Sequence, residues 1–242
     1  MYSADNRLAQ VRRQVEAACH RSKRDPSHVT LIGASKTVEA SRVLEYAQAG
    51  LSYVGENYVQ EGVAKQQSIA ALAPNLDSLH WHLIGALQSN KVRDAVASFE
   101  LVHSVDRISL AQALDKAARD IGKVQDVLLQ VNTGNEASKA GCAPDRVVEL
   151  ARACMALPHI AVRGLMCLPP YQEDAEYSRP HFRLLQQLGQ DVKTALSSTQ
   201  ADAHKDTPLW HLSMGMTNDF EVAIEEGATL VRIGTGLFGA RS

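Results

Sequence analysis

Short aliphatic runs alternate with longer amphipathic stretches along the whole chain. This alternation is typical of β-α-β units, in which parallel strands are buried beneath the helices that connect them. Each run has the length of a single strand. We predict eight strands, over residues 29–34, 53–54, 80–84, 101–103, 127–131, 160–165, 209–212 and 230–233.

The stretches between these runs have the hydrophobic periodicity of helices. Three glycines, Gly50, Gly122 and Gly227, stand where a residue in the left-handed conformation commonly ends a helix. Helices are predicted over residues 41–49, 57–72, 108–121, 145–155, 181–196 and 218–226.

Two further features indicate where helices begin. Asn218 with Glu221 resembles a capping box, although Asn replaces the usual Ser or Thr. An extra helix is expected before the first strand, because Leu8, Val11 and Val15 share one face there.

Eight parallel strands with intervening helices favour a closed (β/α)8 TIM barrel, formed by a single α/β domain over residues 1–242. An open doubly wound sheet remains the alternative, because the pattern does not reveal whether the sheet closes. No repeat or linker divides the chain. The small polar stretch 197–206 is expected to be a surface loop before the seventh strand.

Composition narrows the classes of function. With a formal net charge of -2 and no sustained basic run, the chain has no electrostatic footprint for nucleic acid or an anionic membrane. No signal-peptide or membrane-spanning pattern is present, so we expect a cytoplasmic protein. The cysteines are spaced too widely for a zinc site or a disulfide scaffold and are expected to be reduced and mostly buried: Cys19, Cys142, Cys154 and Cys167.

Polar residues and glycines gather directly after the predicted strands. The C-terminal strand ends form the active face of a barrel, so these segments are expected to meet at one mouth. They are Lys36, residues 55–57, Gly85, Ser104, and residues 132–134, 166–170, 213–215 and 234–236.

Lys36 ends the run VTLIGASK. Strand periodicity places it on the same face as Ile32 and Ala34, which points into the barrel if they do. A lysine held there is partly desolvated, which favours the neutral amine that can attack an aldehyde. From position alone, a lysine whose amine simply reaches solvent remains the alternative.

The segment GTGLFG, from Gly234 to Gly239, matches the G-x-G-x-x-G pattern. A dinucleotide fold requires a long helix and another strand after it, and the sequence contains neither. Backbone N–H groups in a glycine loop can still bind one phosphate, and Ser213 and Thr235 can add hydroxyl donors. Tight turning alone is the alternative explanation of these glycines.

Arg232 and two histidines lie within predicted strands. Arg232 has apolar neighbours, so its guanidinium is expected to enter the barrel mouth and to need an acceptor there, either a carboxylate or a heteroaromatic ring nitrogen. His80 and His82 share one strand face, but no third ligand is spaced to complete a metal site. We therefore expect packing or hydrogen bonding from these histidines rather than zinc.

Six separated motifs, in order, resemble those of one family. The sequence is similar to the pyridoxal 5′-phosphate (PLP) homeostasis proteins, the YggS/PROSC (PLPBP) group, whose fold resembles the N-terminal barrel of alanine racemase. The resemblance runs from about the first strand to the C-terminus. The motifs are GASKT, YVGENYVQE, HLIGALQSNK, GLMCLPP, LSMGMTNDFEVAI and VRIGTGLFG.

The resemblance implies a cofactor and a set of binding residues. Lys36 is expected to hold PLP as a Schiff base, and Asn57 to line the ring. Ser213, Gly234 and Thr235 are expected to bind the phosphate. The family more often has GTAIFG where this chain has GTGLFG.

Arg232, by the same resemblance, faces the pyridine nitrogen. An arginine does not supply the proton that makes the ring a strong electron sink, so carbanion chemistry is expected to be weak. Lys139 matches a lysine that the family carries near the mouth, and it is either a helper in cofactor transfer or a solvated loop residue. Thr217 stands where serine is usual in the family.

Three functions are consistent with these residues. The favoured one is a monomeric PLP-binding protein that buffers the cofactor or hands it to apo PLP-dependent enzymes without turnover. The first alternative is a PLP-dependent racemase or amino-acid lyase, which requires a second acid/base residue opposite Lys36. The Asp and Glu residues form no such pair, and alanine racemase takes its catalytic tyrosine from a separate β domain that has no counterpart here. A Schiff-base aldolase acting on a sugar phosphate is the second alternative.

Overall fold

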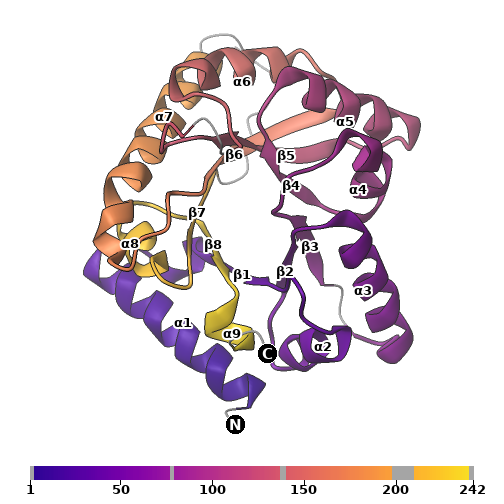
Figure 1. Ribbon diagram of the computed structural model, residues 1–242, viewed down its shortest axis with the longest axis vertical. Helices are drawn as coiled ribbons and strands as arrows, with labels where there is room; N and C mark the ends of the chain where they lie inside the picture. Colours follow the sequence, from indigo (N-terminus) through magenta and orange to yellow (C-terminus); the bar gives the residue numbers. More distant parts are fainter. Residues whose placement is uncertain (1–2, 77–78, 137–139, 198–209, 240–242) are drawn as a thin grey trace.

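A computed structural model of the chain describes residues 3–76, 79–136, 140–197 and 210–239. Eight parallel strands form a closed barrel in sequence order, so the predicted (β/α)8 fold is confirmed over the open sheet (Figure 1). The strands are β1 Thr30–Ala34, β2 Tyr53–Glu56, β3 His80–Leu83, β4 Leu101–Val105, β5 Gln125–Val131, β6 Ile160–Cys167, β7 His211–Met216 and β8 Leu230–Ile233.

Helices surround this barrel, and α1 is the predicted extra helix before the first strand. The α-helices are α1 Ala4–Arg21, α2 Ala40–Gln48, α3 Val59–Leu72, α4 Val92–Ser98, α5 Ile108–Asp120, α6 Val147–Met155, α7 Arg179–Ser197, α8 Phe220–Glu225 and α9 Thr235–Phe238. The short 3-10 helices are η1 Pro26–His28, η2 Ser89–Lys91, η3 Pro144–Arg146 and η4 Ala175–Ser178.

Helix α1 packs against the last part of the chain. Its residues Leu8, Val11 and Val15 are buried, as their spacing predicts, and the helix contacts α8 and α9. Figure 1 shows α1 lying beside these C-terminal elements, across the β8 side of the barrel. The first and last segments of the chain therefore support each other.

Several strands extend further than the hydrophobic runs predict. β6 continues to Cys167 and β7 spans His211–Met216, with Met166 paired to Ser213. Ser213 was expected after its strand and instead lies within it. The ladder of backbone hydrogen bonds continues through polar residues and glycines, which a criterion based on apolar runs excludes.

The helix ends are partly as predicted. Gly50, Gly122 and Gly227 all have positive φ, as expected for residues that end helices. Helix α4, Val92–Ser98, is absent from the sequence prediction, because seven residues are too few for a clear helical period. The predicted surface loop at 197–206 lies almost entirely outside the described residues.

The predicted capping box at Asn218 and Glu221 is wrong. The residue that caps α8 is Asp219, and no side chain donates or accepts a capping hydrogen bond there. The Nδ2 atom of Asn218 instead donates to the carbonyl oxygens of Gln172 and Glu173, at 3.1 Å each. Asn218 therefore joins the start of α8 to the loop that follows β6.

Two layers of side chains fill the barrel. An apolar cluster occupies the middle and contains Ile32, Leu101, Leu128, Met166 and Leu230. His103 and Arg232 lie two positions beyond Leu101 and Leu230 of this cluster, so they point to the same side of their strands but lie nearer the C-terminal mouth. Hydrogen bonds join them to His82 and Ser213, and these four buried polar side chains form a polar layer.

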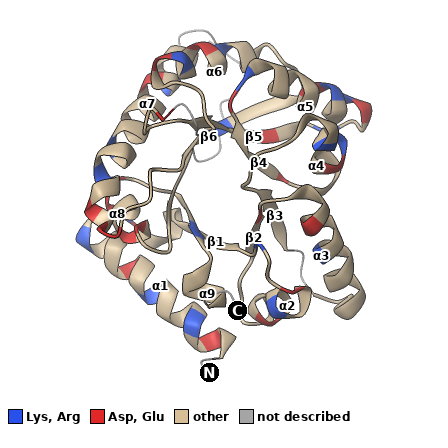
Figure 2. Cartoon of the chain, viewed as in Figure 1, with Lys and Arg blue, Asp and Glu red and all other residues tan. Residues whose placement is uncertain are grey.

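Charged residues are distributed mainly over the outer helices (Figure 2). Among the described residues, no helix combines the length and the apolar character needed to cross a membrane. Cys19, Cys154 and Cys167 are buried and Cys142 is half-buried, all four as free thiols, as the sequence predicts.

Candidate functional site at the C-terminal mouth of the barrel

Lys36 lies in a tight turn just beyond β1. The N–H of Val38 donates to the carbonyl oxygen of Ser35 at 2.9 Å, which closes a four-residue turn with Lys36 in its second position. Lys36 is half-buried, and its Nζ lies 5.6 Å from the ring centroid of Tyr58, which follows β2. Because the strand ends at Ala34, the turn sets the direction of this lysine, rather than the strand alternation used for the prediction.

The glycine loop leaves the neighbouring strand at the same end of the barrel. β1 and β8 are parallel partners, with Gly33 opposite Ile233. Gly234 therefore emerges beside the segment that carries Lys36, and a Cβ built on Gly234 would contact the carbonyl oxygen of Ala34 at 3.4 Å. The two sequence features that we expect to act together, the lysine and the glycine loop, are thus adjacent.

A hydroxyl from β7–α8 is bonded to this loop. The N–H of Gly236 donates to Oγ1 of Thr217 at 3.3 Å, while Thr235 is exposed. Gly236 has no room for a side chain, since a Cβ there would lie 2.9 Å from Ile233 and 3.2 Å from Thr217. Thr217 and Thr235 therefore provide the hydroxyl groups at the glycine loop.

Ser213 lies deeper, in the polar layer, and interacts with Arg232. Nη1 of Arg232 donates to Oγ of Ser213, and Nη2 donates to the carbonyl oxygen of Cys167 at 2.9 Å. From the sequence, we expect a carboxylate or a ring nitrogen as the acceptor for Arg232. Among the described residues, its hydrogen bonds instead go to a hydroxyl and a backbone carbonyl. Arg232 is 3% exposed and Ser213 is fully buried, so this pair closes the inner end of the mouth.

Two histidines extend this hydrogen-bonded chain across the barrel. His103 Nδ1 lies 2.9 Å from Oγ of Ser213, and His103 Nε2 lies 3.2 Å from Nδ1 of His82. A neutral imidazole has one donor and one acceptor nitrogen, so both contacts are satisfied only if the two rings adopt matched tautomers. His82 is therefore hydrogen-bonded, as expected, but His103 was not singled out in the sequence.

Burial determines the charge of this layer. It lowers the pKa of His82 to about 3, with smaller contributions from His211 and His80. Burial also lowers the pKa of His103 well below its usual value, and the neighbouring His82 and Arg232 act in the same direction. The imidazoles are therefore neutral near pH 7. Burial lowers the pKa of Arg232 as well, but a guanidinium keeps its proton in proteins, so Arg232 is the cation of the layer.

Asn57 follows β2 and is half-buried at the mouth. Its backbone lies against Gly85 beyond β3, where an added Cβ would come within 2.3 Å of the Asn57 carbonyl oxygen. The glycine in the motif HLIGALQSNK therefore permits the close approach of two loops. Lys139 lies outside the described residues.

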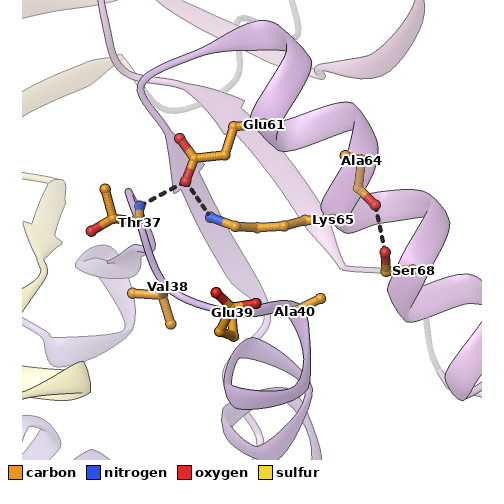
Figure 3. Close-up of a pocket in the computed structure, with 8 residues that line it drawn as sticks. All are labelled: Thr37, Val38, Glu39, Ala40, Glu61, Ala64, Lys65 and Ser68. Atoms are coloured by element: carbon orange, nitrogen blue, oxygen red, sulfur yellow. Dashed lines mark hydrogen bonds and ion pairs between the residues drawn. The ribbon is translucent and has the colours of Figure 1, made fainter.

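A buried ion pair lies behind the turn of Lys36, and the sequence offers no clear signal for it. Glu56, at the end of β2, is fully buried, and its Oε1 accepts hydrogen bonds from Lys65 Nζ at 2.6 Å and Ser35 Oγ at 2.5 Å. Burial raises the pKa of Glu56, although Lys65 and Ser35 oppose that effect. Figure 3 shows Lys65 reaching from α3 toward the turn, together with Glu61.

His80, the first histidine of the HWH motif, bonds to a carboxylate at the start of its strand, away from the mouth. Its Nδ1 lies 2.8 Å from Oε2 of Glu100. In the described part of the chain, no group of three or more His, Cys, Asp or Glu residues is arranged to hold a metal ion.

The family model for the N-terminal domain of alanine racemase matches residues 7–242. A pyridoxal phosphate homeostasis protein of Aquifex aeolicus is 43% identical over 239 residues, which cover 99% of each chain. One of Pseudomonas aeruginosa is 42% identical over 234 residues, which cover 97% of this chain and 94% of that protein. The chain belongs to the pyridoxal phosphate homeostasis protein family.

Solved structures agree with membership of the homeostasis protein family. PipY of Synechococcus elongatus, in a structure with PLP bound, is 34% identical with a TM-score of 0.79, covering 98% of this chain and 100% of PipY. An alanine racemase of Clostridium difficile is 14% identical with a TM-score of 0.66, covering 95% of this chain and 56% of the racemase. The racemase shares the fold of this homeostasis-family barrel.

Proposed function

We propose that this protein binds PLP as a Schiff base on Lys36 and maintains the supply of that cofactor without turning over a substrate. The observation that carries the proposal is the register of β1 and β8, which brings Lys36 and the glycine loop to the same end of paired strands. The pyridoxal phosphate homeostasis proteins it resembles and the PLP-bound structure of PipY support the choice of cofactor.

The residues at the mouth fit the parts of PLP. Gly234, Thr235 and Thr217 offer backbone and hydroxyl donors for a phosphate. Asn57 is expected beside the ring, and Arg232 offers donors to an unprotonated ring nitrogen. Ser213, which bonds to Arg232 and His103, would act at the inner end of the site, through Arg232 or as a further donor to the phosphate.

PLP supplies an aldehyde that combines reversibly with an amine. Lys36 would hold PLP through an imine between its amine and the aldehyde carbon, with loss of one water molecule, and addition of water would release the cofactor. Arg232 keeps its proton, so it orients the ring nitrogen without protonating it, and this favours holding the cofactor over carbanion chemistry.

A PLP-dependent racemase or lyase is the alternative, because alanine racemase shares the fold. It needs an acid/base group on the far side of the cofactor from Lys36. The polar layer holds Arg232 together with two buried, neutral imidazoles, His82 and His103. The proposal therefore remains a binding protein. Transfer to apo PLP-dependent enzymes, a monomeric state, a cytoplasmic location and any role of Lys139 stay predictions.

The test compares the wild type with Lys36→Ala, using Lys91→Ala at η2 as a control lysine near the same mouth. PLP added to wild type and control should produce a visible Schiff-base absorbance band. Borohydride reduction and peptide mapping should then place the pyridoxyl label on Lys36. An equal band in Lys36→Ala, or label spread over many lysines, would contradict the proposal. Sustained racemisation or decarboxylation of amino acids would favour the enzyme.

A further inference from the structure

We infer that Glu56, Glu61 and Lys65 act together as a positioning device for Lys36. We call these three residues the clamp. The inference rests on the proposed function of Lys36, but the contacts that support it are present in the protein alone. Glu56 is the last residue of β2, and Glu61 and Lys65 lie in the first turns of α3. The clamp is therefore next to the turn that carries Lys36.

Lys65 is the centre of the clamp. Its Nζ donates to the carbonyl oxygen of Ser35 at 2.6 Å, to Oε1 of Glu56 at 2.6 Å and to Oε1 of Glu61 at 3.1 Å. An ammonium group has three hydrogens, so these acceptors use all of its donors. The side chain is 8% exposed. The Nζ group of Lys65 is therefore fully engaged within the clamp and does not compete with Lys36 for an aldehyde.

Both neighbours of Lys36 are attached to the clamp. Before it, Ser35 donates its hydroxyl to Glu56 and accepts at its carbonyl oxygen from Lys65. After it, the N–H of Thr37 donates to Oε1 of Glu61 at 2.7 Å. Figure 3 shows Glu61 bridging Thr37 and Lys65. The backbone on each side of the lysine is thus fixed, while its own side chain extends over Tyr58 on the mouth side.

The conformation of Thr37 gives a reason for such a clamp. Its φ is 63°, in the left-handed region, which a β-branched residue rarely adopts. Such a residue persists when its surroundings determine it from several directions. The bond from Thr37 to Glu61 and the closure of the turn by Val38 provide these restraints. Without them, the turn would relax and Lys36 would leave its position.

The test uses Glu61→Ala, because Glu61 is partly exposed and its loss leaves the buried pair of Lys65 and Glu56 intact. Ser68→Ala is the matched control. Ser68 lies on the same helix and, with Thr37, Glu61 and Lys65, lines a pocket beside the turn (Figure 3), but its hydroxyl donates to the carbonyl oxygen of Ala64 and not to the turn. Glu61→Gln is the conservative variant, because an amide oxygen can still accept from Thr37.

The first measurement needs no cofactor. Amide hydrogen exchange at Thr37 should be about tenfold faster in Glu61→Ala than in wild type, since one hydrogen bond to a charged group is lost. Exchange at Thr37 should be unchanged in Ser68→Ala and largely restored in Glu61→Gln. Equal protection in Glu61→Ala and wild type would overturn the inference, whatever the outcome with PLP.

The second measurement is PLP binding, followed by absorbance and by mapping of the reduced label. We expect Glu61→Ala to bind PLP about tenfold more weakly, with a melting temperature close to that of the control. A lower affinity that follows only a lower melting temperature would indicate a purely structural role and overturn the inference. Wild-type protein that fails to bind PLP would refute the proposed function, and hydrogen exchange would still decide whether the clamp positions the turn.

Discussion

Nδ1 of His103 lies 2.9 Å from the hydroxyl oxygen of Ser213, inside the barrel. Because Ser213 also accepts a hydrogen bond from Arg232, His103 is connected through one hydroxyl to the cation of the polar layer. His82 continues the chain on the other side of His103. The arrangement of Arg232 at the inner end of the site therefore depends on two uncharged imidazoles.

Replacing His103 should destabilise the protein. His103→Phe leaves Ser213 without its imidazole partner and His82 Nδ1 without its neighbour, in a fully buried layer. We expect the free energy of unfolding to fall by about 1 to 3 kcal/mol, measured by urea denaturation. The exposed His28 provides the control, and His28→Phe should change the free energy of unfolding by less than about 0.5 kcal/mol. Equal stability of the two variants would contradict the role assigned to His103.

The buried histidines should make stability depend on pH. The folded protein holds the pKa of His82 at about 3, below its usual 6.5, so between these values the unfolded chain binds a proton that the folded chain does not. Stability is therefore complete above about pH 6.5 and is lost as the pH falls, by about 1.4 kcal/mol per pH unit for each such histidine.

This pH dependence can be isolated with His82→Gln. The raised pKa of Glu56 acts in the opposite direction, because that carboxyl group stabilises the fold less as the pH rises, but it is common to both proteins. Urea denaturation between about pH 7 and pH 5 should therefore give a shallower slope for His82→Gln than for the wild type. Identical slopes would mean that His82 takes up its proton in the folded state.

Arg179 should contribute more to stability than an ordinary surface arginine. It bonds to Glu176, to Glu225 at 2.8 Å and to Glu226 at 2.7 Å, and these hydrogen bonds raise its pKa. The bonds to Glu225 and Glu226 join the start of α7 to the end of α8. Arg179→Met should lower the free energy of unfolding by about 1 to 2 kcal/mol, and less at high salt.

The control for Arg179 is Arg146, whose ion pair with Glu149 lies on the surface, with both side chains more than half exposed. Arg146→Met should lower the free energy of unfolding by less than about 0.5 kcal/mol. If both variants lose the same free energy of unfolding, the ion pairs around Arg179 stabilise the fold no more than a surface ion pair does.

The cysteines should react slowly in the folded protein. Burial raises the pKa of Cys154 to about 11 and that of Cys142 and Cys167 to about 12, so little reactive thiolate is present near pH 8. Burial also raises the pKa of Cys19. A thiol-reactive dye should label all four cysteines much faster in urea than in buffer. Rapid labelling of the folded protein would show that one of these sites opens.

The local pattern of the sequence was enough to predict the strands and most helices, and it favoured a closed barrel over an open sheet. Apolar runs separated by amphipathic stretches identified eight strands and the extra helix α1, because burial beneath helices requires that alternation. The residue types at the mouth were also visible, since Lys36, Arg232 and Gly234 each stand out against their neighbours. Short helices such as α4 were missed, because hydrophobic periodicity needs several turns to appear.

Which residues touch each other was decided only by the tertiary structure. The contacts of Lys65 with Ser35 and of His103 with Ser213 join residues 30 and 110 positions apart. No local pattern records such pairs, because barrel closure and strand register bring them together and burial then sets their charge. The sequence by itself therefore determined the order of strands and helices and the residues at the mouth. The tertiary structure closed the barrel and decided how Lys36 is held and why the buried imidazoles beside Arg232 are neutral.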